Sequence, residues 1–288
     1  MSTAITGGMT GVGGATSTNV TGAGGGSATT VTGSSGGSAG TTGAVGGTGG
    51  SGAGSGGSGG SGANPCDSAV LCEDFEATEL AEIPDGWSLQ GDVGVASDQA
   101  RSGSRSLKVG RAENGPRRIT RSAMDFGSAH FGRIFYRVEQ PVPSAFVHAT
   151  FVSLGGNDSE YRTVDTVKND QGDHQFLYNI QPAGNEWGCG SDYDHRFDDQ
   201  WHCAEWEIDA VSQTFRYYFD GVELAEIGVS GGQSNASACG TPPAIPSSFD
   251  DIRIGLYNYQ AAPPGFVVWI DDLVISHSRV GCVPTDGS

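Results

Sequence analysis

Charged residues are missing from the first part of the chain. Residues 1–63 contain none, and they hold 25 of the 48 glycines, mixed mostly with serine, threonine and alanine. Such a composition cannot bury enough apolar surface to offset the conformational entropy that ordering would cost. Residues 1–63 are therefore predicted to be a disordered Gly/Ser/Thr-rich tether, and residues 64–288 a single folded domain.

Lysine is scarce in residues 64–288. This part carries 2 lysines and 13 arginines against 33 acidic residues, so the whole net charge of −18 lies on it. A field of this sign argues against nucleic acid and against anionic membrane surfaces as partners. It is compatible with a bound cation or a neutral ligand. An anionic ligand would need a local arginine site, since the guanidinium fork fits a carboxylate.

Long apolar runs and a secretory signal are also absent. No stretch of about 20 apolar residues is present, so no transmembrane helix and no membrane insertion are predicted. The opening residues MSTAITGGMT lack a basic n-region and an apolar h-region. A Gly/Ser tether before a cysteine-bearing domain still suits a secreted or cell-surface tethered protein. We expect that the signal is missing from this sequence, and that the protein is a monomer.

The cysteines form no C-x-x-C pair, which argues against a zinc ribbon or a redox motif. Six are present, an even number, and disulfides in an oxidising compartment account for them best. Six cysteines permit 15 pairings. Pairing within local loops predicts three bonds: Cys66–Cys72, Cys189–Cys203 and, from the remaining two, Cys239–Cys282.

Helical periodicity is almost absent, whereas short alternating runs separated by Gly, Pro, Asn and Asp are frequent. This pattern predicts an all-β sandwich. Asp220-Gly221 is typical of a tight hairpin turn, and residues 169–173 (NDQGD) are interpreted as another. About ten strands are expected, at residues 71–76, 104–110, 131–139, 146–154, 174–181, 202–209, 214–221, 222–228, 251–259 and 266–276.

Segments spread over residues 66–282 carry a resemblance to a known family. They are LCEDFE (71–76), ARSGSRSLKV (100–109), WHCAEWEID with FRYYFDG (201–221), and IRIGLYNY with VVWIDDLVIS (252–276). The layout resembles the concanavalin A-like jelly rolls of secreted carbohydrate-active proteins. Within them it is most similar to a polysaccharide-lyase group that includes glucuronan lyases and cellulose-induced secreted proteins. The resemblance implies a two-sheet β-jelly-roll sandwich whose partner is a polysaccharide.

The same resemblance implies a structural calcium ion, Ca2+, where the first and last strands meet. It places Glu76 and Asp271 at ligand positions, with Asp272 close behind and a backbone carbonyl near Ser102–Ser104 completing the shell. Calcium takes 6–8 oxygen ligands, mixing carboxylates and carbonyls. Alternation also predicts that the two adjacent aspartates face opposite sides of an apolar strand, so that one of them needs a partner. The alternative is that one caps backbone amides and the other is solvated.

The resemblance implies β-elimination on a uronic-acid-containing glycan. Such a site must neutralise the carboxylate next to C5, remove the C5 proton and protonate the leaving oxygen. Alternation along residues 174–181 and 251–259 leaves several polar side chains opposite the apolar face. The predicted catalytic residues are His148, Arg162, Gln175 and Tyr257, and the predicted substrate-binding residues are Arg253, Tyr259 and Asn179. Tyr257 is the first candidate for proton transfer and Arg162 for holding the carboxylate.

Two other functions stay open. A non-catalytic carbohydrate-binding module would need only an aromatic platform, for which Tyr257 and Tyr259 are suited. A glycoside hydrolase would need paired carboxylates, which alternation offers at Glu205, Glu207 and Asp209. The alginate-lyase runs Arg-x-Glu-x-Arg and Gln-Ile-His are absent, which argues against the lyase. The hydrolase is less favoured than either, because the closing Glu of a laminarinase-type run is missing after Glu207 and Asp209.

Overall fold

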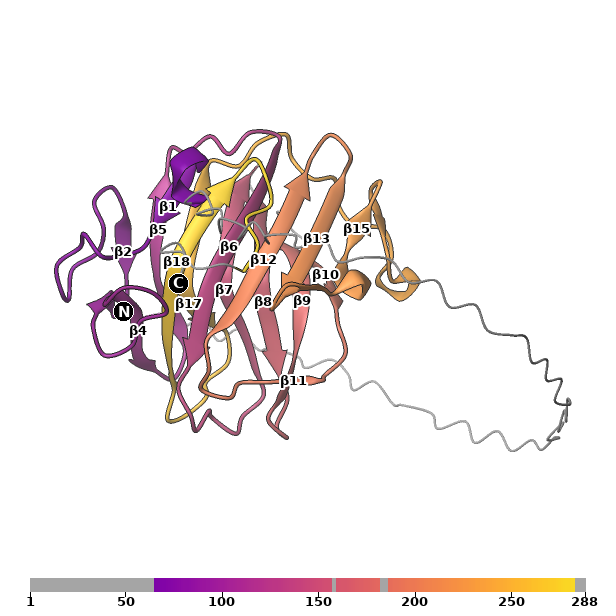
Figure 1. The fold of residues 1–288 in the computed structure, drawn as a ribbon. Coiled ribbons are helices and arrows are strands. Elements are labelled where there is room, and N and C mark those ends of the chain that lie inside the picture. The colour runs from indigo at the N-terminus through magenta and orange to yellow at the C-terminus, as the bar shows by residue number, and fades with distance from the viewer. Residues whose placement is uncertain (1–64, 157–158, 182–185, 283–288) are drawn as a thin grey trace, which may run out of the picture. The chain divides into compact units, whose positions relative to one another are not determined.

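Two antiparallel sheets pack face to face in the computed structural model, which describes residues 65–156, 159–181 and 186–282 (Figure 1). The predicted tether, residues 1–63, lies outside the described residues. The all-β sandwich predicted from the sequence is confirmed. The described helices are three short 3-10 turns, η1 (Pro65–Ser68), η2 (Ala225–Ile227) and η3 (Ser237–Cys239). None of these described helices has the length and apolar character needed to cross a membrane.

The strands divide into a ten-stranded and an eight-stranded sheet. The larger sheet contains β1 (Leu71–Glu73), β3 (Val93–Ala96), β4 (Ser106–Ala112), β6 (Ala129–Val138), β12 (His202–Asp209), β13 (Thr214–Phe219), β14 (Val222–Glu223), β15 (Val229–Ser230), β16 (Gln233–Ser234) and β18 (Phe266–Ser276). The smaller sheet contains β2 (Ser88–Gln90), β5 (Gly115–Ser122), β7 (Val147–Gly156), β8 (Ser159–Lys168), β9 (Asp173–Gln181), β10 (Trp187–Gly190), β11 (His195–Arg196) and β17 (Asp251–Asn258).

The expected strand at residues 222–228 is wrong in most of its length. Only β14 is extended there, and the chain then turns into η2. The hairpin before it is as expected, because Asp220 and Gly221 both have positive φ, 47° and 82°. That pair of angles is typical of the tight two-residue turn that matches the twist of its strands.

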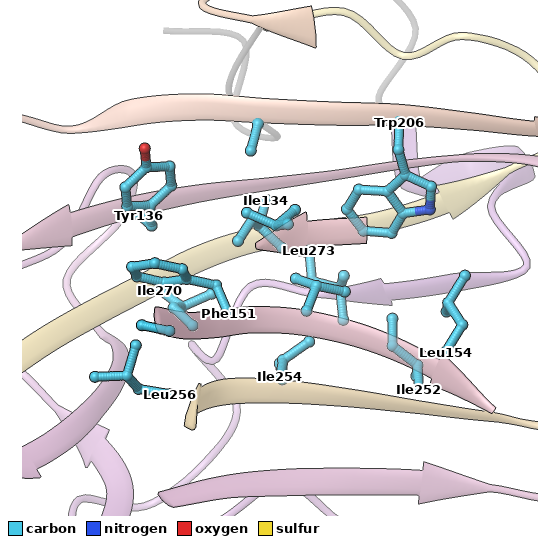
Figure 2. Close-up of a cluster of buried hydrophobic side chains, with 14 of the residues drawn as sticks. Ile134, Tyr136, Phe151, Leu154, Trp206, Ile252, Ile254, Leu256, Ile270 and Leu273 are labelled. Carbon is cyan, nitrogen blue, oxygen red and sulfur yellow. The ribbon is translucent and has the colours of Figure 1, made fainter. Parts of the chain in front are cut away.

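The core lies between the sheets and contains every second residue of the central strands. Figure 2 shows the two layers meeting: Ile134, Tyr136, Trp206, Ile270 and Leu273 come from the larger sheet, and Phe151, Leu154, Ile252, Ile254 and Leu256 from the smaller. Each of these side chains is at most 2% exposed. Because the inward residues of β17 and β9 are apolar, their polar neighbours must lie on the outer face of the smaller sheet.

The two ends of the domain meet, as the resemblance implies. β1 pairs with β18, with Leu71 opposite Ile275 and Glu73 opposite Leu273. Two hydrophobic strands that are about 200 residues apart in the chain thus become neighbours, which brings the acidic residues that flank them into the same region.

One of the three predicted disulfides is confirmed. Cys66 bonds to Cys72, but the other two predicted bonds are wrong: Cys189 bonds to Cys239 and Cys203 to Cys282. The reason is topological. Between β10 and β12 the chain passes from the smaller sheet to the larger one, so Cys189 and Cys203 are close in sequence but lie on different sheets.

Candidate functional site

Most of the predicted site residues gather on the outer face of the smaller sheet. In the strand register, Arg253 of β17 lies opposite Ser153 of β7, which lies opposite Arg162 of β8, which lies opposite Asn179 of β9. Three predicted residues therefore form one row across four strands. A second row begins with Tyr257, which lies opposite Thr150.

His148 and Tyr259 are joined by a chain of short polar contacts. His148 Nε2 lies 2.7 Å from Asp165 Oδ2, and Thr150 Oγ1 donates to Asp165 Oδ1 at 2.6 Å. The Tyr259 hydroxyl lies 3.2 Å from Thr150 Oγ1. The ring of Tyr259 also packs against the ring of His148, with centroids 4.6 Å apart. A histidine and a tyrosine that could exchange protons with a ligand are thus held side by side.

Arg162 brings a positive charge next to Tyr259. Its guanidinium lies 4.6 Å from the centre of the Tyr259 ring and donates to Glu186 Oε1 at 2.8 Å and to Gln181 Oε1 at 2.5 Å. Burial alone would lower the pKa of Arg162, but Tyr259, Asp165 and other nearby groups raise it on balance. The side chain therefore stays cationic at any physiological pH.

Asn179 shares the carboxylate that Arg162 binds. Its Nδ2 donates to Glu186 Oε1 at 2.7 Å, so one carboxylate oxygen receives both an amide and a guanidinium hydrogen bond. Burial tends to raise the pKa of Glu186, but these two partners outweigh it and lower that pKa. Arg162 and Asn179 are themselves buried, at 2% and 3% exposure, whereas the Glu186 side chain that they bind is 50% exposed, so Glu186 would have to move away before a carboxylate from solvent could reach the two donors.

Tyr257 lies on β17 and Tyr259 just after it, and the two hydroxyl groups differ in their hydrogen bonds. Their rings stack, with centroids 4.2 Å apart at 25°. Burial raises the pKa of Tyr259 to about 12, and its hydroxyl is engaged with Thr150. The hydroxyl of Tyr257 makes no hydrogen bond within residues 65–156, 159–181 and 186–282, so it is the one available to a ligand.

Gln175 and Arg253 lie on the same face but outside this cluster. His148 and Gln175 both pair with Val167, on its two sides, which separates them by two strand spacings, about 10 Å. Arg253 is held by Glu160 at 3.2 Å and by Asp251 at 3.0 Å. Both residues could contact an extended ligand, but the structure does not bring them to His148.

Three carboxylates of this face, Asp165, Glu160 and Glu186, were not predicted. Asp165 and Glu160 lie on β8, a strand that the sequence interpretation omitted. The signal that could have found Asp165 is its place in TVDTVK (163–168), a lone carboxylate among β-branched residues. The register of β8 against β9 shifts between Arg162 and Asp165, so simple alternation would still have placed one of them on the wrong face.

The predicted metal ligands lie around the loop of residues 101–105. Glu76 accepts hydrogen bonds from the backbone of Ser104 at 2.8 Å and of Arg105 at 2.7 Å. Asp271 Oδ2 accepts from Arg101 N at 2.8 Å, and Ser102 Oγ donates to Asp272 Oδ1 at 2.8 Å. The loop thus meets both ends of the domain through N–H and O–H donors, where carbonyl ligands were expected.

Asp271 and Asp272 are both fully buried, at 0% exposure, so the alternative in which one of them is solvated is wrong. The register of β18 against β6 shifts between Asp271 and Val274, and Asp272 has a positive φ of 51°. This bulge breaks the alternation on which the expectation rested. Burial, and next the carboxylate of Asp272, raise the pKa of Asp271 to about 8.

These carboxylates suit a hard cation by their chemistry. Three acidic side chains from the two ends of the domain surround one loop. Two of them are adjacent and buried, where like charges need a positive charge beside them, and the buried guanidinium of Arg133 already supplies one. Among the described residues, however, Glu76, Asp271 and Asp272 do not bring three ligand oxygens within 4.8 Å of one another; the group that does come this close is Cys203, Glu205 and Cys282, whose two sulfurs are joined in a disulfide and cannot act as thiolate ligands. A bound cation would therefore need the 101–105 loop to exchange its donors for oxygen ligands.

The carboxylates that a glycoside hydrolase would use have structural partners on the larger sheet. Glu205 is 2% exposed and accepts from Gly281 N at 2.7 Å and from Arg279 at 2.9 Å. Glu207 binds Arg216 across the hairpin at 3.0 Å. Asp209 accepts from Ser212 in the turn that follows its strand. All three are occupied by bonds that hold the fold.

Comparisons with known proteins support the fold. No family model and no curated protein matches the sequence. Among solved structures, the cellulose-induced protein Cip1 superposes with a TM-score of 0.52 at 18% identity, covering 74% of this chain and 99% of that chain. A structure of botulinum neurotoxin type C, a toxin whose cell entry depends on interaction with two ganglioside molecules, gives a TM-score of 0.50 at 13% identity. It covers 76% of this chain but half of the toxin chain. At these identities the similarity establishes a shared β-sandwich fold.

Proposed function

We propose that this domain binds a uronic-acid-containing polysaccharide on the outer face of its smaller sheet and cleaves it by β-elimination. The observation that supports this most is the convergence of His148, Tyr257, Tyr259, Arg162 and Asn179, from four strands and their ends, on one face. A guanidinium, an amide, an imidazole and an accessible phenol are the groups that this reaction requires.

Arg162 and Asn179 bind the uronate carboxylate in this proposal. They already hold the carboxylate of Glu186, at 2.8 and 2.7 Å, which the substrate carboxylate replaces. Neutralising that group makes the neighbouring C5–H bond more acidic, because negative charge spreads into the carboxylate as the proton leaves.

His148 then removes the C5 proton and Tyr257 protonates the leaving glycosidic oxygen. The C5–H and C4–O bonds break, a C4–C5 double bond forms, and the two chain ends separate as an unsaturated uronate and a new hydroxyl. The imidazole gains one proton and the phenol loses one, so transfer of that proton from the imidazolium to the phenolate, directly or through water, restores the site.

A non-catalytic binding module is the second candidate. It is favoured by the stacked pair Tyr257 and Tyr259, which offers aromatic surface to a sugar ring, and by Arg162, whose charge is already paired with Glu186. The cellulose-induced protein and the ganglioside-dependent toxin both have this sandwich fold, which fits either candidate.

The test of cleavage is absorbance from a new C4–C5 double bond. The intact chain is incubated with a panel of polyuronates and, as a control, with neutral glucans and xylans. We expect absorbance to rise with at least one polyuronate and with no neutral polymer, because Arg162 and Asn179 select a carboxylate. Retention on a polyuronate column without any rise in absorbance would instead support the binding module and contradict the lyase.

We propose, in addition, that a structural calcium ion is held by Glu76, Asp271 and Asp272. The ion would stabilise the junction of β1 and β18 by neutralising the buried aspartates, and it takes no part in the reaction. Three disulfides within residues 65–282 fit an oxidising compartment, so we also propose that the protein is secreted or held at a cell surface.

Calcium is expected to raise the melting temperature of the chelator-treated protein. At a concentration 100 times its Kd, an ion that binds only the folded state adds about 2.7 kcal/mol, or roughly 5–10 °C for a domain of this size. Asp271→Asn should abolish this rise in melting temperature. Asp251 is a half-buried aspartate of the other sheet, and Asp251→Asn should leave the rise intact. A melting temperature that is indifferent to calcium in the wild-type chain would contradict the site.

A further inference from the structure

Asp165 is a buried carboxylate that the proposed reaction does not use directly. Its exposed fraction is 0%, and its two oxygens each meet one side chain of the candidate site, His148 on one side and Thr150 on the other. No lysine or arginine in the described ranges forms an ion pair with it. A buried carboxylate held only by a histidine and a hydroxyl suggests that its position serves those two groups.

The hydrogen atoms along this chain of contacts can be assigned. An ionised carboxylate only accepts, so Thr150 must give its single hydroxyl hydrogen to Asp165 Oδ1, at 2.6 Å. The Tyr259 hydroxyl, 3.2 Å away, must then donate to Thr150 Oγ1. By the same rule, the atom that faces Asp165 Oδ2 at 2.7 Å is His148 Nε2 carrying its hydrogen.

The other ring nitrogen of His148 is left as the base. When Nε2 carries the hydrogen, the lone pair of the neutral imidazole is on Nδ1. Within the described part of the chain Nδ1 accepts no hydrogen bond, and the side chain is 16% exposed, so this lone pair is open to a ligand on the outer face.

We infer that Asp165 is a positioning residue that fixes His148 in the Nε2–H tautomer and aims its Nδ1 at the bound sugar, with Thr150 and Tyr259 holding the carboxylate in place. The catalytic consequence of this inference rests on the proposed function, but the tautomer does not. A merely structural role for Asp165 would keep the strands together without any preference between the two tautomers.

The tautomer is measured by 15N NMR of the histidine side chains in the intact chain at a pH where the imidazole is neutral, with the His148 signals assigned by their loss in His148→Gln. We expect a pyrrole-type signal for Nε2 and a pyridine-type signal for Nδ1. In Asp165→Asn the amide can donate to Nε2, so we expect the opposite tautomer or a mixture. Wild-type signals that show mixed tautomers, or an unchanged single tautomer in Asp165→Asn, would overturn the inference.

Kinetics give a second readout if the chain cleaves a polyuronate. Asp165→Asn should lower kcat by about 10²-fold or more and displace the acid limb of the pH profile, because His148 no longer presents the lone pair of Nδ1 as the base. KM should change at most a few-fold, because Arg162 and Asn179, which bind the substrate carboxylate, are unchanged. Retained kcat and an unchanged pH profile in an active enzyme would refute the positioning role while the lyase stands. No cleavage by the wild type, with the expected tautomers, would refute the lyase while the positioning geometry stands.

Two further variants protect the test against loss of folding. Thr150→Val removes the donor to Asp165 Oδ1 and should lower kcat about 10-fold, whereas Thr150→Ser keeps the hydroxyl and should restore it. Equal kcat in the valine and serine variants would refute the role of the chain of contacts. Asp220→Asn is the matched control, because Asp220 binds His202 at 2.8 Å on the larger sheet and should affect neither His148 nor cleavage.

Discussion

Replacing Tyr257 by phenylalanine is expected to lower kcat for polyuronate cleavage by about 10²–10⁴-fold, the range that general acid catalysis contributes. The substitution removes one oxygen that has no hydrogen-bonding partner in the described structure. Phenylalanine keeps the ring that stacks on Tyr259 at 4.2 Å, so binding and folding should be preserved. KM is therefore expected to change little, and steady-state kinetics by ultraviolet absorbance separate the two parameters.

Two companion variants decide between the tyrosines of this face. Tyr218→Phe is the matched control, because Tyr218 lies on the larger sheet, where the guanidinium of Arg279 lies 3.7 Å from its ring centre, and it should leave kcat intact. Tyr259→Phe removes the donor to Thr150 and should have a smaller effect than Tyr257→Phe. If the order is reversed, Tyr259 is the proton donor. If His148→Gln and Tyr257→Phe both retain full activity, the proposed reaction is wrong.

The sequence was sufficient for the fold and for one face of the site, because both depend on alternation. Strand β17 has Ile252, Ile254 and Leu256 in the core, which by itself places Arg253 and Tyr257 outward. The same logic holds for β9, where Phe176, Tyr178 and Ile180 are fully buried and Asn179 faces outward. The register of β17 against β7 does shift between Ile254 and Tyr257, but the alternation of core residues continues through Leu256, so a period of two still determines which of its side chains can meet a ligand.

Bulges mark the limit of that logic. The registers of β7, β8 and β9 shift around Val152 and between Arg162 and Asp165, and β18 shifts after Asp271. In β8 and β18 the shift changes which face the following residues reach, and it depends on how neighbouring strands fit and not on local composition. For this reason Asp165, which holds His148, could not be placed from the sequence, and the burial of both Asp271 and Asp272 did not follow from alternation.

Apart from the pairing of β1 with β18, which the resemblance implied, contacts between distant segments could not be predicted either. The disulfide Cys203–Cys282 joins β12 to the segment after β18 across a separation of 79 residues. Glu186 reaches Arg162 only because β9 and β8 are neighbours in the sheet. For the disulfide, closeness in sequence favoured a shorter pairing, and for the Glu186–Arg162 ion pair the sequence offered no signal. Both contacts depend on which strands become adjacent in the fold.

Two histidines outside the site are buried without a hydrogen bond. His130 and His174 are each 1% exposed, and neither nitrogen of either ring has a partner. Phe126 and Phe249 lie beside His130, with ring centroids 5.6 and 5.5 Å away, and His174 stacks on Phe197 at 4.1 Å. Both rings therefore occupy positions that a neutral aromatic side chain would fill.

Burial lowers the pKa of each of these histidines to about 3. For His130 the neighbouring His277 acts in the same direction. For His174 the nearby His195, His202 and Lys168 also lower the pKa, and Asp198 opposes them. In the unfolded chain a histidine takes up its proton near pH 6.5, so between pH 6.5 and 3 the unfolded state binds more protons and stability falls as the pH falls.

The double variant with phenylalanine at positions 130 and 174 is expected to resist acid. At pH 4.5, two units below the unfolded pKa, each neutral histidine costs the wild type about 2–3 kcal/mol, so removing both should raise the free energy of unfolding by about 5 kcal/mol relative to the wild type. The carboxylates titrate alike in both proteins and cancel in this difference. Urea unfolding at pH 7.5 is the internal control, because there the difference in the free energy of unfolding between the double variant and the wild type should be much smaller. A gap between the two proteins that is the same at pH 4.5 and pH 7.5 would mean that His130 and His174 are reached by protons in the folded state, and that the packing around them is looser than the burial of their rings indicates.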